Sequence, residues 1–293
     1  DGIWDVVDGL QRLSTIFQFT GILRDENDNL VNPLVLEKTK YLPSLENKKW
    51  NDENDPENSL TNAQRLIIKR SKLDISIILY LSDRRGKFEL FQRLNTGGSP
   101  LSAQEVRNSI LVMLNPEYYR WIRELSQLES FKECVQLTDK ALLEQYDMEL
   151  VLRFLVFRTM EAEDLSSIGD IHEFLTEKMI EFVTNETINM ENETHEFKRT
   201  FDFLKENFGS DCCKRYDTDK DKFVGGFLIS AFELVAISAG YEISKVIENG
   251  NRIVEITKSL WMNENFTSKS GSGMRASYRI PNTLPLGRRE FTK

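Results

Sequence analysis

The chain has 293 residues, of which 40% are hydrophobic and 29% charged, which allows one large domain or two ordinary ones with a sizeable core. No apolar run approaches the roughly 20 residues that a membrane-spanning helix needs, so we expect a cytoplasmic protein without a membrane partner. The net charge of −9 and the isoelectric point of about 5.1 exclude a general nucleic-acid coat protein.

Residues 1–100 mix strand-like and helical sequence. The predicted strands are residues 3–7, 34–45 and 73–81, and the predicted helices are residues 10–23, a short helix capped by Thr61 or Asn62 through residue 72, and residues 87–94. We therefore expect a small α/β domain over residues 1–100. Because the chain opens without Met and directly in strand-like sequence, we also expect that N-terminal strands of this domain are missing.

The sequence from residue 101 onward is nearly all helical. Ser102 and Glu105 form the capping box S-x-x-E at the start of a helix over residues 103–114. Further helices are predicted at residues 117–129, 139–160, 170–184, 193–208, 222–239 and 250–263. The predicted fold class is thus α+β: the α/β domain, an all-helical domain over residues 101–265, and a basic Gly/Ser/Arg tail over residues 266–293.

The first segment with chemical character is VVDGLQRLST, residues 6–15. A strand brings Asp8 to its end, Gly9 permits a tight turn, and the helix that follows presents unpaired N–H groups to an anion. Arg12, one turn further, is placed to bind a phosphate with two N–H groups. Asp8 orients a water, binds a metal together with a nucleotide, or caps the helix at Gln11, and capping is the more frequent role of such an Asp.

The second segment is FQRLNTGGSPLSAQEVRN, residues 91–108, in which a glycine loop leads into a capped helix. Gly97 and Gly98 favour a loop whose amides face an anion, although a glycine pair also ends many helices. The polar side chains around this loop are those of Arg93, Asn95, Gln104, Arg107 and Asn108. Their density favours a binding site, while each of them alone has an ordinary structural interpretation.

A third segment, MELVLRFLVF, places Glu149 and Arg153 four residues apart in an apolar helix. This spacing predicts an intrahelical ion pair that is partly buried and that supports the site structurally. The sequence predicts no metal site, because Cys134, Cys212 and Cys213 do not have the spacing of metal ligands. We expect these cysteines to be buried or incidental thiols. No nuclease motif is present either.

Together the three segments resemble the GmrSD-type domain family, whose signatures are D-G-Q-Q-R-L-T-T and F-x-R-[LI]-N-x-G-G-x-x-L-[ST]-x-x-E-x-R-N. The resemblance extends over most of residues 3–240 and implies a ParB/sulfiredoxin-like α/β domain followed by a helical region. It also implies a module that binds and hydrolyses a nucleoside triphosphate, with Mg²⁺, in a bacterial anti-phage system of the type IV restriction kind.

The resemblance assigns roles residue by residue. It implies Asp8 and Arg12 as catalytic residues. The implied nucleotide-binding residues are Gly9, Gln11, Arg93, Asn95, Gly97, Gly98, Arg107 and Asn108, and the supporting residues are Glu105, Glu149 and Arg153. The partners we expect are DNA, met by the basic tail, a separate nuclease domain or subunit, and a second copy of this chain in a homodimer.

Two residues depart from the family signature, and one of them leaves an alternative open. Leu10 stands where the signature has Gln, and Ser14 stands where it has Thr. The Leu10 change is either a neutral packing change or the loss of a substrate contact. The alternative to a nucleoside triphosphatase is therefore a member of the same family that binds a ligand or DNA without turnover.

Overall fold

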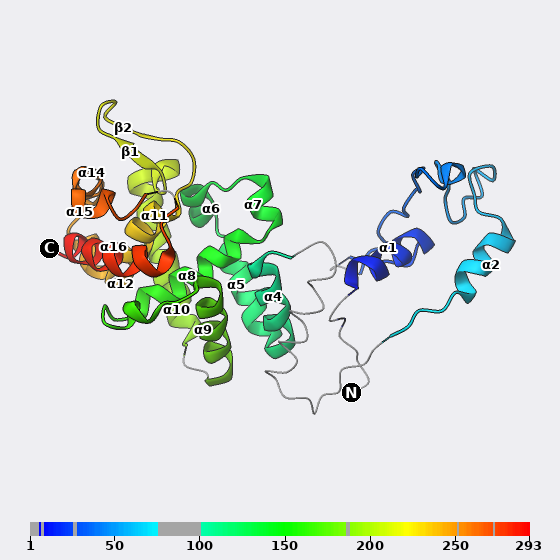
Figure 1. Cartoon of the computed structure of the whole chain (residues 1–293), viewed down its shortest axis with the longest axis horizontal. Helices are drawn as coiled ribbons and strands as arrows, with labels where there is room; N and C mark the ends of the chain where they lie inside the picture. The colour runs from blue at the N-terminus through cyan, green and yellow to red at the C-terminus, as the bar shows by residue number, and fades with distance from the viewer. Residues whose placement is uncertain are drawn as a thin grey trace. The chain divides into compact units, whose positions relative to one another are not determined.

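The computed structural model describes residues 6, 9–25, 28–75, 101–185, 188–250, 252–271 and 273–293 (Figure 1). It forms two compact units, residues 1–100 and 101–293, which are described separately. The described chain is mostly helical with one small two-stranded sheet, so the α+β class is confirmed. The ParB/sulfiredoxin-like topology is not established by this structure and stays a prediction.

The first unit contains helix α1 (Leu10–Thr20), the 3-10 helix η1 (Pro43–Leu45) and helix α2 (Asn62–Arg70). Gly9 precedes α1 and Gly21 follows it, both with positive φ, so glycines bound the helix at each end. Phe19 of α1 packs its ring edge-to-face against Trp50 at 5.6 Å between centroids. The predicted helices at residues 10–23 and after Thr61 are therefore confirmed.

The predicted strands of this unit are not found where the structure can be read. Residues 34–45 form no strand. Leu36 exchanges backbone hydrogen bonds with Asn47 and Lys48, and the Leu34 amide donates to the backbone oxygen of Gln18 in α1, but these isolated bonds do not continue into a ladder. Pro43 lacks an N–H for a ladder and instead begins η1. The predicted strand at 3–7, most of the one at 73–81 and the helix at 87–94 lie outside the described residues.

The second unit consists of helices around one core. Its elements are α4 (Ala103–Leu114), α5 (Pro116–Ser126), α6 (Glu129–Val135), α7 (Asp139–Leu143), α8 (Tyr146–Thr159), η2 (Asp164–Ser167), α9 (Ile171–Asn185), α10 (Met190–Phe208), η3 (Gly209–Asp211), β1 (Arg215–Asp217), β2 (Lys222–Val224), α11 (Ile229–Phe232), the π-helix η4 (Glu233–Ile237), α12 (Ser238–Tyr241), α13 (Ile243–Glu248), α14 (Arg252–Met262), α15 (Glu264–Thr267) and α16 (Ala276–Phe291). Among the described helices, none has the length and apolar character that a membrane span requires.

Helix α8 is the centre of this unit. Every residue from Asp147 to Arg158 is buried, so the helix is covered on all sides. On one side the ring of Phe154 meets Phe197 at 5.1 Å and Phe201 at 5.5 Å, both from α10. Because α8 is covered on all sides, its charged side chains must find partners inside the protein. These partners form the charged network described below.

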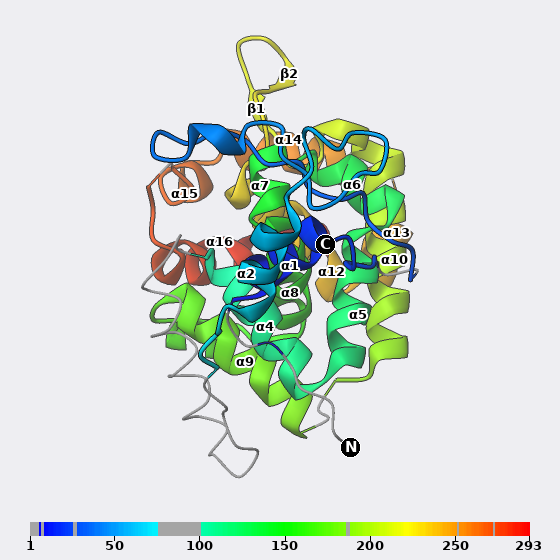
Figure 2. The same cartoon turned by 90° about the vertical axis from the view of Figure 1, so that its right-hand side faces the viewer.

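Two predicted helices are interrupted. The helix predicted over residues 139–160 is two helices, because Gln145 adopts the left-handed conformation (φ 59°) between α7 and α8. The helix predicted over 222–239 is replaced at its start by the antiparallel hairpin of β1 and β2, which projects from the helices (Figure 2). Gly225, with φ 85°, follows the hairpin directly. The hairpin shows that the prediction of an all-helical region is wrong at this place.

The predicted basic tail is also corrected. Residues 276–291 form helix α16 in spite of Pro281 and Pro285, which remove two backbone donors from it. Arg279 and Arg288 of this helix are buried. Arg288 donates to the backbone oxygens of Phe157 and Met160 at the end of α8, so this segment is part of the core of the unit.

We predict that Gly240→Ala destabilises the protein. A Cβ atom on Gly240 would lie 2.5 Å from the ring of Phe154, which is itself fully buried. Overpacking of this kind costs about 1–3 kcal/mol, whereas Ala for Gly inside a helix otherwise stabilises by up to about 1 kcal/mol. Urea unfolding measures the free energy. The control is Gly226→Ala, which has open space around it; equal unfolding free energies for the two variants would contradict the prediction.

Candidate functional site

The first motif is described from Gly9 onward. The helix begins at Leu10, so Gly9 is its N-cap residue, with φ 88° and without a side chain to cap the first amides. The Arg12 guanidinium lies against Gly9, since a Cβ atom there would be 3.2 Å from Nη2 of Arg12. Gln11 and Arg12 are exposed, and Asp8 lies outside the described residues. The tight turn predicted for Gly9 is confirmed.

The second motif is described from residue 101 onward, and Arg93, Asn95, Gly97 and Gly98 lie outside the described residues. The predicted capping box is confirmed. The Ser102 amide donates to Glu105 Oε2 at 2.7 Å, and the Glu105 amide donates to Ser102 Oγ at 3.2 Å. Ser102 Oγ also donates to the backbone oxygen of Glu144 at 2.8 Å, which ties the start of α4 to the end of α7.

The inward face of α4 is polar over its first two turns. Arg107 is fully buried there, and all of its nitrogen atoms have protein acceptors. Nε donates to Gln104 at 2.7 Å, Nη1 to the backbone oxygen of His172 at 3.3 Å, and Nη2 to Glu149 Oε2 at 2.5 Å. Gln104 in turn donates to Asn108 Oδ1 at 2.8 Å. In this conformation Arg107 binds α8 and α9, and its predicted contact with a nucleotide stays a prediction.

The predicted ion pair between Glu149 and Arg153 is confirmed. Arg153 donates to Glu149 Oε1 from Nε at 2.9 Å and from Nη2 at 2.7 Å, and both side chains are more than nine-tenths buried. Glu149 therefore gives one oxygen to Arg107 and the other to Arg153. The sequence indicated the pair within α8, and the structure adds a partner from α4.

Two further members of this network were not predicted. Glu233, at the start of the π-helix, lies 3.6 Å from Nη1 of Arg153. Arg279 of α16 grips the same carboxylate with Nε at 2.6 Å and Nη2 at 2.9 Å. Glu233 stands within the apolar sequence AFELVAI, the same kind of signal that singled out Glu149. We call Arg107, Glu149, Arg153, Glu233 and Arg279 the charge ladder.

Burial and mutual attraction set the charges of the ladder. Burial by itself raises the pKa of Glu149, but the guanidinium groups of Arg153 and Arg107 outweigh it and hold this pKa below its ordinary value. Burial also lowers the pKa of Arg153, and the Glu149 carboxylate reverses that effect, so this pKa is raised. For Arg107 burial prevails and the pKa is lowered. Burial raises the pKa of the nearby Tyr146 to about 12. Since arginines stay protonated, the ladder holds three positive and two negative charges.

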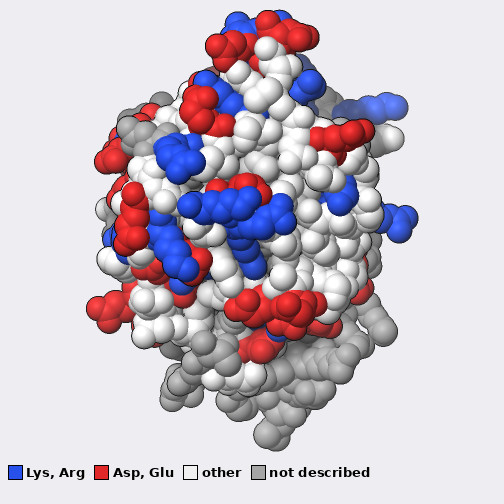
Figure 3. All heavy atoms as spheres, turned by 90° about the vertical axis from the view of Figure 1, so that its left-hand side faces the viewer, with Lys and Arg blue, Asp and Glu red and all other residues white. Residues whose placement is uncertain are grey.

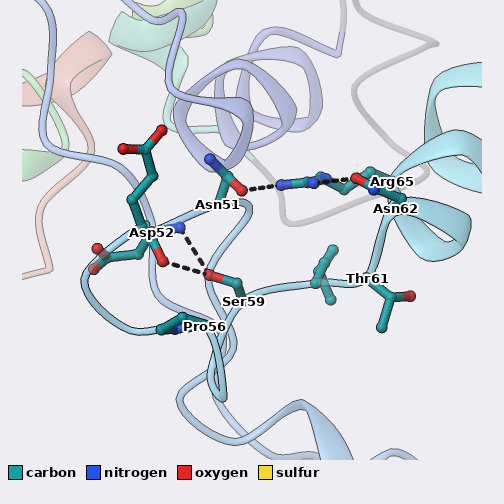
Figure 4. Close-up of a pocket in the computed structure, with 9 residues that line it drawn as sticks. Asn51, Asp52, Pro56, Ser59, Thr61, Asn62 and Arg65 are labelled. Atoms are coloured by element: carbon teal, nitrogen blue, oxygen red, sulfur yellow. Dashed lines mark hydrogen bonds between the residues drawn. The ribbon is translucent and has the colours of Figure 1, made fainter.

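A separate polar pocket of about 260 Å³ lies in the first unit between the loop 51–62 and the start of α2 (Figure 4). Arg65 reaches across it and donates to the side-chain oxygens of Asn51 and Asn62. Its guanidinium thus fastens the loop to the helix. None of the site residues predicted from the sequence lines this pocket.

The described residues contain no group of three His, Cys, Asp or Glu side chains that could hold a metal ion. The cysteines are free and buried, as expected for structural thiols. A hydrogen bond with Cys212 raises the pKa of Cys134, and burial raises it further. A protonated, buried thiol is a poor nucleophile and a poor metal ligand.

The basic surface expected for DNA is smaller than the sequence suggested. Two of the six basic side chains in residues 266–293, Arg279 and Arg288, are buried, and Arg289 and Lys293 both pair with Glu290, at 3.0 and 2.7 Å. On the face in Figure 3, acidic side chains border the basic ones. Of the other two, Arg275 is exposed and Lys269 is half-buried, and neither forms an ion pair with an acidic side chain among the described residues.

A comparison of the sequence with known families finds a match to the first part of the chain. Residues 1–112 match the sequence model of the GmrSD restriction endonuclease N-terminal domain, so this segment is a GmrSD-type N-terminal domain. The match ends within α4 and leaves Glu149 and Arg153 outside it, which is shorter than the resemblance over residues 3–240 implied. No curated protein matches the chain, and no solved structure matches it.

We predict that Glu149→Gln destabilises the protein by about 3–5 kcal/mol at neutral pH, because it leaves two buried guanidinium groups without their shared carboxylate. The pKa of Glu149 is lower in the folded protein than in the unfolded chain. The carboxylate therefore stabilises the fold above the unfolded pKa, near 4.3, and this contribution is lost as the pH falls through the folded pKa. Urea unfolding between pH 7 and pH 3 measures both effects.

The matched control for this substitution is Glu144→Gln, which removes an exposed carboxylate that lies 3.7 Å from Lys140. Exposed pairs of this kind contribute less than about 1 kcal/mol. The prediction is wrong if both variants lose stability equally, or if the unfolding free energy of Glu149→Gln falls with acid as steeply as that of the unchanged protein.

Proposed function

We propose that this protein is a nucleotide-binding regulatory component of a restriction system, with its phosphate-binding site at the start of α1. The family match over residues 1–112 supports a component of a restriction system. Binding and hydrolysis of a nucleoside triphosphate, and a ParB/sulfiredoxin-like topology around the site, are what we propose beyond that match.

The arrangement of Gly9 and Arg12 carries the proposal. Gly9 has a left-handed backbone and no side chain, so a bulky anion can approach the first amides of α1 closely. Those amides and the positive end of the helix dipole attract negative charge. Arg12, against Gly9, adds a charged donor at the same place. A backbone amide seat and a guanidinium that lie together suit a phosphate group.

The roles of the remaining residues follow from this placement. Gln11 lies one residue before Arg12 on the exposed start of the helix and would contact the nucleotide beside the phosphate. Asp8, immediately before Gly9, would orient the attacking water or hold Mg²⁺ that arrives with the triphosphate. Arg93, Asn95, Gly97 and Gly98 are proposed as the opposite wall. In this structure Arg107 and Asn108 face α8, which supports a positioning role for them.

The restriction system supplies the expected partners. The family belongs to restriction endonucleases, and no nuclease motif occurs in this sequence. We therefore propose that DNA cleavage, where it occurs, is performed by a nuclease domain or subunit outside this chain, and that nucleotide binding regulates it. DNA binding and a homodimer remain proposals.

We predict that Arg12→Ala weakens nucleotide binding while leaving the fold intact, because the side chain is exposed. A hydrogen bond to a charged group contributes about 1.5–3 kcal/mol, which corresponds to a dissociation constant about 10- to 150-fold higher. Isothermal titration calorimetry with GTP, CTP and ATP, each with Mg²⁺, measures this change.

The matched control is Arg70→Ala, which removes an exposed arginine from the end of α2 in the same unit. It should bind every nucleotide as the unchanged protein does. An Arg12→Ala variant with unchanged affinity would overturn the proposed role of Arg12, and the absence of nucleotide binding by the unchanged protein would overturn the proposed function.

One observation favours a second function, binding without turnover. Leu10 is 63% exposed at the first position of α1, beside the proposed phosphate site. The family signature has a glutamine at this place. An exposed leucine gains little from packing, so the change is better explained as a lost polar contact than as a packing substitution.

We predict that Leu10→Gln raises nucleotide hydrolysis without a large change in affinity, because an amide at this position can hold a water or a phosphate oxygen. The expected gain in turnover is at least about tenfold, equivalent to about 1.4 kcal/mol of transition-state stabilisation. Release of inorganic phosphate is measured with Leu10→Asn as a shorter amide for comparison. Equal turnover in all three proteins would remove this reason for regarding Leu10 as inactivating.

A further inference from the structure

We propose that Glu233 and Arg279 are positioning residues for α4, the last helix of the GmrSD-type segment. They act through the other members of the charge ladder and so hold α4 in its place against the neighbouring helices of the second unit. This network involves none of the residues at the start of α1, so a failure of the protein to bind nucleotide would leave the role of Glu233 and Arg279 unchanged.

Helix α4 is attached to the rest of the second unit through charged side chains. The family match ends at residue 112, inside α4, so this helix belongs to the N-terminal segment by sequence. By packing it belongs to the second unit, where it contacts α5, α8 and α9. The buried face of its first two turns carries Arg107 and the amide side chains of Gln104 and Asn108. The strongest contact between this face and α8 is the charged hydrogen bond from Arg107 to Glu149.

The Glu149 carboxylate depends on the rest of the ladder for its position. Its second oxygen is held by two nitrogens of Arg153, whose Nη1 has no hydrogen-bond acceptor among the described atoms and instead faces Glu233 at 3.6 Å. Arg153 is therefore balanced between two carboxylates. Without the charge of Glu233, Arg153 would depend on Glu149 alone and would compete with Arg107 for it.

Glu233 is fixed in turn by the C-terminal helix. Arg279 holds both of its oxygens and donates from Nη1 to the backbone oxygen of Met274 at 2.9 Å. The crossing of the two elements is close: a Cβ atom on Gly287 of α16 would lie 2.4 Å from Ser238 Oγ and 3.0 Å from the backbone oxygen of Leu234. Helix α16 can thus shift little, and it fixes Glu233 firmly.

The same unit contains a buried ion pair that serves as a control. Arg158 of α8 donates to both carboxylate oxygens of Glu193 of α10, at 2.7 and 2.9 Å. This pair starts from the same central helix, is equally buried, and shares no partner with the ladder. Breaking it should loosen α10 and leave the seat of α4 unchanged.

Hydrogen–deuterium exchange of the full chain, read by mass spectrometry, tests the proposal. Glu233→Gln removes one charge from the ladder, and Arg279→Lys keeps the charge but loses the two-pronged grip, so it serves as the milder variant if the first does not fold. We expect exchange in residues 103–114 to become about tenfold faster in these variants, with a smaller change in α10. Glu193→Gln should show the opposite distribution.

The outcomes are decisive in both directions. Faster exchange confined to α4 and the ladder helices, together with its absence in Glu193→Gln, supports the positioning role. Exchange in α4 that matches the unchanged protein in both ladder variants overturns it. Equal acceleration of α4 and α10 in ladder and control variants also overturns it, because that is the result of a general loss of stability.

Discussion

The second unit depends on one carboxylate shared between two arginines. Glu149 lies on a helix that is buried on every side, where a lone charge would be very costly. Arg153 pairs with it from within the same helix, and Arg107 pairs with it from α4. Glu233 in turn pairs with Arg279, which extends the network of opposite charges to α16. Buried ionic groups are often no more stabilising than apolar ones, but they permit fewer arrangements. The ladder therefore fixes which helices meet around α8, and the aromatic core supplies the bulk of the packing.

Much of the local structure could be predicted because its causes are local. The capping boxes at Thr61 and Ser102, the helix after Gly9 and the pair of Glu149 with Arg153 all lie within one or two turns of sequence. The two motifs of the N-terminal segment are equally local, and the family match over residues 1–112 confirms the family that they indicated. The phosphate site itself was predicted at residues that the structure describes only in part.

The features that sequence reasoning missed depend on distant residues or on unusual backbone. The residues around Gln145 contain no glycine or proline that would predict its left-handed conformation, which divides one expected helix into two. Pro281 and Pro285 disfavour the helix that α16 nevertheless forms, because its buried face packs against the π-helix and the end of α8. Glu233 and Arg279 lie 46 residues apart in the sequence, and only the tertiary fold brings them together. The same pairing removes from the surface a charge that the sequence had assigned to a DNA-binding tail.

The polar seat of α4 has a consequence for how easily the helix can detach. When an apolar helix leaves its place it exposes hydrophobic surface, and water opposes the movement over the whole area. When the first turns of α4 leave theirs, Arg107 and Glu149 regain hydration that burial had taken from them, which offsets part of the lost attraction. The contact between α4 and the helices around it is therefore specific in its partners, and part of the cost of breaking it is returned as hydration of the separated charges. Acidity acts on this contact through Glu149, whose carboxylate is the partner of Arg107, whereas ionic strength acts on it weakly because buried pairs are little screened.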